Sequence, residues 1–208
     1  MLEMFGTRSS NLHVVPNGVE EIFFKNSPST IHHPKSPWLV CTATITERKR
    51  VLELAEAAVL SKTPVWIIGK PYTEKDPYYL RFLEVVSKSE GDLRYEGGIS
   101  DRSQMADIYK GARGFVLLST MESRSLSSEE AAAAGCPLLL SDLQWARCTF
   151  ESNATYCPIT NKTEATAQTL KSFHIQAPNL PIPSKPKTWN DVALQLKGIY
   201  EELLNEKG

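Results

Sequence analysis

The chain has 208 residues, enough for one large domain or for one domain with extensions. A hydrophobic content of 41% predicts a full core and argues against disorder. The 23 basic and 24 acidic residues nearly cancel, which disfavours a nucleic-acid-binding surface. No apolar run approaches the ~18 residues of a membrane-spanning helix. The first residues lack the charged-then-apolar order of a signal peptide, so we expect a cytoplasmic location.

Apolar runs alternate with helical patterns along the chain. The expected strands span residues 38–43, 65–68, 93–96, 114–118, 138–140 and 154–157. The expected helices span residues 48–60, 78–87, 103–110 and 127–134, and Thr188 can cap a last one. Continuous Val, Ile and Leu strands between helices predict an α/β fold, a Rossmann-like doubly wound parallel sheet. Ligands bind such sheets at the carboxyl ends of the strands.

Two extensions flank the expected sheet. Residues 12–19 predict a strand that runs into an Asn17-Gly18 turn. Residues 176–187 are rich in proline and predict an extended connector. The last helix carries an apolar stripe from Trp189 to Leu204. That stripe must pack on something, either this sheet or a separate domain.

The segment after the fourth expected strand carries two glutamates eight positions apart, Glu122 and Glu130. Free backbone N–H groups near residues 126–128 can hold a phosphate at a helix start. A carboxylate on each side can accept hydrogen bonds from sugar hydroxyls. The structural alternative is a capping box between Ser127 and Glu130, with Glu122 a solvated loop acid. The local pattern leaves both interpretations open.

A basic segment lies between the first expected strand and its helix. Arg48, Lys49 and Arg50 would stand in the first helical turn, where each cation opposes the helix dipole by roughly 0.3–1 kcal/mol. A local rule broken without evident gain often marks a site. One of these cations would then neutralise a diphosphate. The alternative is a solvated basic face.

Other signals are weaker. Gly69 and Gly98 follow strands and would let a flat base approach the backbone, although such glycines more often mark turns. The histidines lack metal-ligand spacing, so we expect no metal. The sequence contains no GxGxxG loop and no Walker A loop, which disfavours a dehydrogenase or an NTPase.

Together these motifs resemble one family. The chain looks like the C-terminal, nucleotide-sugar-binding domain of the family-4 retaining glycosyltransferases, two-domain enzymes of the GT-B type (glycosyl transferases group 1). The resembling segments are residues 15–19, 43–49, 93–101, 122–137 and 189–204, and from the first to the last they span nearly the whole chain. Residues 122–137 hold the E-x7-E spacing, and its tail includes Gly135 and Pro137.

The resemblance implies a role for each site residue. Lys49 would hold the donor diphosphate and Glu122 would support the charge at the anomeric carbon, so these two are the implied catalytic residues. Glu130 would hold the ribose hydroxyls. The other implied donor-binding residues are Thr44, Arg48, Gly69, Gly98, Ser125, Leu126 and Ser127. The sequence departs from the family at Thr44, where many members have arginine, and at Ser123 and Ser125, where the family usually has glycine.

The resemblance also implies a domain organisation and an activity. Residues 1–22 would be the remnant of a segment between domains, 23–175 the nucleotide-sugar-binding domain, and 176–208 a connector and closing helix. The enzyme would be of the hexosyltransferase type and would serve cell-surface polysaccharide or glycoconjugate synthesis, without a cofactor. Residues 1–5 look like the end of a helix from an acceptor-binding N-terminal domain that the chain lacks. We therefore expect the chain to bind a nucleotide-sugar donor but to transfer poorly alone. The full-length enzyme would associate with the inner face of the membrane.

Two other functions stay open. A degenerate, non-catalytic nucleotide-sugar-binding or interaction domain is favoured by Thr44 and by the serines after Glu122. A GT-B-type nucleotide-sugar epimerase would have a similar fold. The sequence at residues 15–19 and the closing helix favour the transferase over the epimerase.

Overall fold

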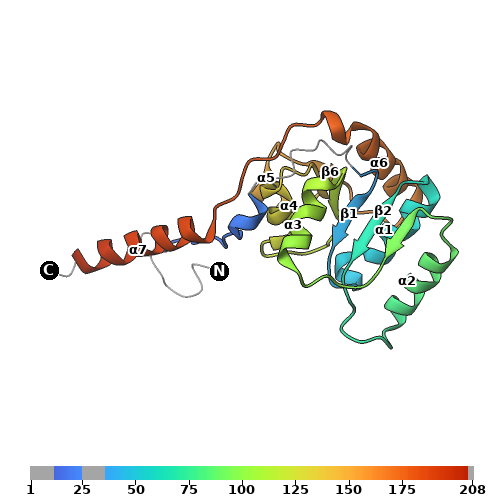
Figure 1. Ribbon diagram of the computed structural model, residues 1–208, viewed down its shortest axis with the longest axis horizontal. Coiled ribbons are helices and arrows are strands. Elements are labelled where there is room, and N and C mark those ends of the chain that lie inside the picture. Colours follow the sequence, from blue (N-terminus) through green and yellow to red (C-terminus); the bar gives the residue numbers. More distant parts are fainter. Residues whose placement is uncertain (1–11, 25–35, 206–208) are drawn as a thin grey trace.

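The computed structural model describes residues 12–24 and 36–205. They form a six-stranded parallel sheet with the strand order β3-β2-β1-β4-β5-β6 (Figure 1). The strands are β1 (Leu39–Thr42), β2 (Val65–Ile68), β3 (Leu93–Tyr95), β4 (Gly114–Leu117), β5 (Leu138–Ser141) and β6 (Thr155–Cys157). The α-helices are α1 (Val51–Ser61), α2 (Pro77–Lys88), α3 (Arg102–Gly111), α4 (Leu126–Ala133), α5 (Gln144–Phe150), α6 (Thr163–Gln176) and α7 (Trp189–Asn205). Short 3-10 turns are η3 (Glu21–Phe23), η4 (Glu47–Lys49) and η5 (Ala177–Asn179).

Helices cover both faces of the sheet. One core layer joins the sheet to α1, α2 and α6, and the other joins it to α3, α4, α5 and η3 (Figure 1). Every residue of β4 and β5 is buried, which explains why these strands are continuous apolar runs without alternation. The predicted doubly wound parallel sheet is confirmed, and all six predicted strands are present within one or two residues at their ends.

Two helices were not predicted. Helix α5 has only seven residues, too few for a periodic pattern to stand out. Helix α6 buries Thr166, Ala167, Leu170 and Phe173 against α1, but polar residues and threonines dilute its apolar stripe. Tertiary packing on α1 therefore stabilises a helix that local sequence supports weakly.

The predicted first turn of α1 is wrong. The helix begins at Val51, and Arg48 and Lys49 lie in the separate turn η4. Arg50 occupies the N-cap position with a left-handed φ of 52°, so the chain changes direction between the turn and the helix. The side chain of Arg50 is buried and donates to the carbonyl of Thr160 at 2.8 Å. Arg48 and Lys49 are thus held on a loop at the sheet edge instead of inside a helix.

The alternative interpretation of Ser127 and Glu130 as a capping box does not match α4. Ser125 is the N-cap, and its Oγ accepts a hydrogen bond from the amide of Ser128 at 3.3 Å. Ser127 lies in the first turn of the helix, and Glu130 pairs with an arginine from another helix. The predicted end of the helix is confirmed, since Gly135 has a φ of +74° just after the C-cap.

The predicted strand at residues 12–19 is wrong. Among these residues only Val19 makes a β-bridge, a parallel one with Thr188. A Cβ at Gly18 would lie 2.5 Å from the backbone nitrogen of Trp189. Gly18 therefore permits close crossing of two segments and does not form a turn. The predicted helix remnant at residues 1–5 lies outside the described residues.

Helix α7 begins with the predicted Thr188 cap. The Thr188 hydroxyl accepts from the amide of Asp191 at 3.1 Å, and the Asp191 carboxylate accepts from the amide of Thr188 at 2.8 Å. The helix extends away from the sheet (Figure 1), and Val192 is its one buried residue among those described. Trp189, Tyr200 and Leu204 are exposed, so the apolar stripe does not pack on this sheet.

No helix in the described ranges combines the length and hydropathy needed to cross a membrane.

Replacing Gly69 by alanine should destabilise the fold. A Cβ there would lie 1.8 Å from the carbonyl oxygen of Ala43, so the ends of β1 and β2 would have to move apart. We expect the free energy of unfolding in urea to fall by about 1–3 kcal/mol or more. Gly111→Ala is the matched control, because no atom lies within 4 Å of its added Cβ, and it should be neutral or stabilising by up to about 1 kcal/mol. Equal stability of the two variants would contradict the steric argument.

Candidate functional site

The site lies where the strand order reverses, between β1 and β4 at the centre of the sheet. These strands pair in parallel, with Leu39 opposite Gly114 and Val40 opposite Phe115. Their carboxyl ends therefore meet at one edge, and so do the loops that follow them. The first loop carries Arg48 and Lys49, and the second carries Glu122.

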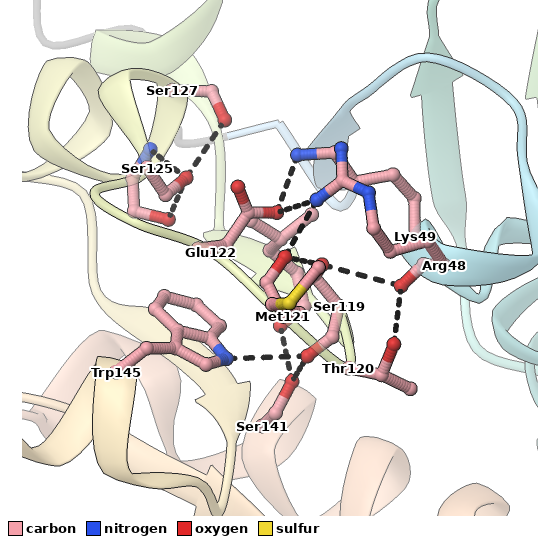
Figure 2. Close-up of polar contacts among 12 residues, drawn as sticks. Arg48, Lys49, Ser119, Thr120, Met121, Glu122, Ser125, Ser127, Ser141 and Trp145 are labelled. Atoms are coloured by element: carbon pink, nitrogen blue, oxygen red, sulfur yellow. Dashed lines mark hydrogen bonds and ion pairs between the residues drawn. The ribbon is translucent and has the colours of Figure 1, made fainter. Parts of the chain in front are cut away.

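The three predicted charged residues contact one another (Figure 2). The Nζ of Lys49 donates to Oε1 of Glu122, and Nη1 of Arg48 lies 3.4 Å from the same oxygen. Arg48 also donates to the carbonyl of Met121 at 2.5 Å. The side chain of Glu122 is only 9% exposed, so both cations offset the cost of burying its charge. The sequence pattern placed Arg48 and Lys49 in a first helical turn and Glu122 after a distant strand, and the fold brings them into one cluster.

Backbone contacts tie the two loops together. The carbonyl of Arg48 accepts from the amide of Thr120 at 2.8 Å and from the hydroxyls of Ser119 and Thr120 at 3.2 Å each. The carbonyl of Ser119 accepts from Ser141 Oγ at 2.5 Å and from Trp145 Nε1 at 3.3 Å (Figure 2). The loops after β1, β4 and β5 are thereby connected at the sheet edge. Ser141 and Trp145 were not predicted, because nothing local marks a side chain that supports a carbonyl of another loop.

The amino end of α4 faces this cluster. Figure 2 shows Ser125 and Ser127 beside Glu122. The amides of Leu126 and Ser127 make no hydrogen bond within the described part of the chain. The hydroxyls of Ser125 and Ser127 are 3.3 Å apart. Free amides and the helix dipole make this helix start favourable for a negatively charged group.

A buried ion pair shapes the loop between Glu122 and α4. Nε of Arg124 donates to Oε1 of Glu129 at 2.5 Å, and the Glu129 side chain is 1% exposed. Oε2 of Glu129 is buried without a hydrogen-bond partner. Burial raises the pKa of Glu129, and Arg124 opposes that rise. Arg124 is therefore fixed against α4, between Ser123 and Ser125.

Glu130 is part of a second ion-pair cluster. Nη2 of Arg102 donates to Oε1 of Glu130 at 2.5 Å, and Nε of Arg102 donates to Glu20 at 2.8 Å. The guanidinium lies 4.8 Å from the ring centroid of Phe23. Burial raises the pKa of Glu130, and Arg102 acts in the opposite direction. Arg102 was not predicted, although a cation at the first position of α3 breaks the same dipole rule that marked Arg48 and Lys49.

Three other predicted residues line one cavity. Thr44, Gly69 and Gly98 border a cavity of 410 Å³ at the carboxyl ends of β1, β2 and β3. Lys70 and Tyr72 also line it. The stem of Lys70 packs on Gly98, since a Cβ there would lie 3.3 Å from Lys70 Cγ. The described residues contain no group of three or more His, Cys, Asp or Glu that could hold a metal ion.

No family model matches the sequence, and a search of curated proteins found no match. Solved structures do match. A glycosyltransferase from Rickettsia africae superimposes with a TM-score of 0.72 at 18% identity and covers 98% of this chain. Sucrose-phosphate synthase from Thermosynechococcus elongatus gives 0.68 at 18% identity over 99% of the chain. Anabaena Alr3699/HepE in complex with UDP gives 0.69 at 15% identity over 96% of the chain.

The chain is shorter than these proteins. It spans 60% of the Rickettsia chain, 56% of the synthase chain and 60% of the HepE chain. The likeness therefore concerns one part of each. With its six-stranded parallel sheet and its long C-terminal helix, the chain has the fold of one half of a GT-B glycosyltransferase.

Proposed function

We propose that the chain is the nucleotide-sugar-binding part of a retaining glycosyltransferase, which moves a sugar from a nucleoside-diphosphate sugar to an acceptor. One observation carries the proposal: Lys49, Arg48 and the free amides at the start of α4 converge around Glu122. Such an arrangement suits a diphosphate joined to a group rich in hydroxyls. HepE, a structure of similar fold, has been solved with UDP and with UDP-glucose, which supports the same ligand class.

The cations and the helix start would hold the diphosphate. Lys49 and Arg48 contact Glu122, so a bound phosphate would have to share or take over these donors. The amides of Leu126 and Ser127 would supply two further donors. When the bond to the sugar breaks, negative charge grows on the leaving diphosphate. Donors that are already in place stabilise this charge without reorganising.

The two predicted glutamates would contact different parts of the donor. Glu122 would face the sugar, where its carboxylate stabilises the positive charge that develops at the anomeric carbon. Glu130 would accept hydrogen bonds from the ribose hydroxyls through the oxygen that Arg102 leaves free. The base would occupy the cavity that Thr44, Gly69 and Gly98 line. The proposal thus divides the donor among three groups of residues.

The acceptor would bind outside this sheet. We place its site on a further domain that packs against the exposed apolar stripe of α7. The chain alone would then bind the donor and transfer poorly. In the cell, the complete enzyme would serve cell-surface polysaccharide or glycoconjugate synthesis at the inner face of the membrane.

A second candidate is a non-catalytic interaction domain. Each buried glutamate of the site already has a basic partner inside the fold: Glu122 has Lys49, Glu129 has Arg124, and Glu130 has Arg102. The described site is therefore electrostatically satisfied without a ligand. Nucleotide binding separates the two candidates.

Calorimetry of the chain with UDP, GDP and ADP tests donor binding. We expect one of them to bind, and Lys49→Met to weaken it about 10- to 100-fold, because a charge-assisted hydrogen bond to phosphate contributes roughly 1.5–3 kcal/mol. Lys88→Met, at the exposed end of α2, is the matched control and should leave the affinity unchanged. Absence of binding to all three at millimolar concentrations would favour the interaction domain.

Glu122→Gln should separate binding from catalysis. The amide no longer holds Lys49 and Arg48 by charge, so both cations are available to the diphosphate. We expect the nucleotide affinity of the chain to stay equal or to rise a few-fold. Turnover of the full-length enzyme should fall by about 10²–10³, the usual loss when a stabilising charge is removed from a transition state. A tenfold loss of nucleotide affinity with normal turnover would contradict this assignment.

A further inference from the structure

Arg102 links three elements beside the proposed ribose site. We propose that Arg102 is a positioning residue for nucleotide binding: it fixes Glu130 with one carboxylate oxygen free for the ribose hydroxyls. The inference rests on the proposed function and adds a residue to it.

The ion pair between Arg102 and Glu130 uses one of the two carboxylate oxygens and leaves the other available to a ligand. Arg102 bonds Oε1 of Glu130, and Oε2 has no hydrogen-bond partner among the described residues. The Glu130 side chain is 12% exposed, whereas that of Glu129 is 1% exposed. Because a carboxylate oxygen can accept more than one hydrogen bond, Oε2 can serve two neighbouring hydroxyls. The 2′ and 3′ hydroxyls of a ribose are two such neighbouring hydroxyls.

Arg102 is itself held from two other sides. Glu20 accepts from its Nε at 2.8 Å, and the ring of Phe23 lies under the guanidinium. Both residues belong to the segment that precedes the sheet, whereas Arg102 begins α3 and Glu130 lies in α4. A planar guanidinium with fixed neighbours gives its partner a fixed orientation. The orientation of the Glu130 carboxylate is therefore set by the fold itself.

Charge supports the same role. The titratable and charged groups that face Glu130 are Arg102 and Tyr109 from α3, Glu20 from the leading segment, and Glu129 from α4. Arg102 is the one cation among these described groups. Burial raises the pKa of Glu130, Glu20 and Glu129 raise it further, and Arg102 lowers it. Only the ionised carboxylate accepts from both hydroxyls, so ribose binding should be present above this pKa and should be lost as pH falls through it.

The test compares a nucleoside diphosphate with its 2′,3′-dideoxy analogue, using whichever of UDP, GDP and ADP binds. In the wild-type chain the ribose form should bind about 10- to 100-fold more tightly. Arg102→Met should reduce this preference to less than about threefold, and Arg102→Lys should restore part of it. Arg81→Met, an exposed arginine on α2, is the matched control and should keep the full preference.

The pH profile gives a reading that a purely structural role would not give. The ribose preference of the wild-type chain should disappear as pH falls, and in Arg102→Met it should disappear at a higher pH, because Arg102 lowers the pKa of Glu130. The ratio of the two ligands cancels the protonation of the phosphates, because both carry the same diphosphate. If Arg102→Met fails to fold, Glu20→Gln removes one anchor of the guanidinium and should lower the preference about two- to fivefold.

The outcomes are distinct. If the wild-type chain binds no nucleotide, the proposed function falls and this inference falls with it. If the wild type binds and prefers ribose, but Arg102→Met keeps both the preference and the pH midpoint, only the inference is overturned. Tighter binding to Arg102→Met would also overturn it, because Arg102 would then be blocking Glu130 instead of positioning it.

Discussion

The pairing of β1 with β4 is the constraint on which the site depends. Because these strands are neighbours in space but distant in the chain, their loops meet although about seventy residues separate them. The helices that follow them lie in different layers, so the two loops turn toward opposite faces of the sheet from one edge. At that edge Lys49 contacts Glu122, and α4 begins with its free amides. Without this reversal of strand order, the same residues would be ordinary surface charges.

Much of this arrangement could be predicted from the sequence. Buried parallel strands are continuous apolar runs, so β4 and β5 can be recognised from the order of apolar residues in the sequence. Gly135 marks the end of α4, since a left-handed residue there favours glycine. Once the strands are known, the rule that ligands bind at their carboxyl ends brings Lys49 and Glu122 to the same edge. Topology therefore accounts for where these residues lie, whereas the roles predicted for them rested on the family resemblance.

The parts that could not be predicted depend on contacts between distant residues. Whether Ser125 or Ser127 caps α4 is decided by how the loop arrives, and that loop is fixed by Arg124 on buried Glu129. The left-handed turn at Arg50 is supported by Thr160, which lies 110 residues further on. The conformational propensities of the local sequence carry no information about these distant partners. The signal that the sequence did offer was an arginine at a locally unfavourable position. Such an arginine marks a residue that is stabilised by partners from distant parts of the chain.

The carbonyl of Arg48 has a consequence for the energetics of recognition. It accepts hydrogen bonds from both Ser119 and Thr120, so the loop bearing the cations and the loop bearing Glu122 are one rigid unit before a ligand arrives. Loops that order only on binding lose conformational entropy at that moment, and affinity falls accordingly. Here the ordering has already occurred during folding. A ligand of the proposed class would therefore find the backbone of both loops already ordered, and its binding would lose little conformational entropy in ordering them.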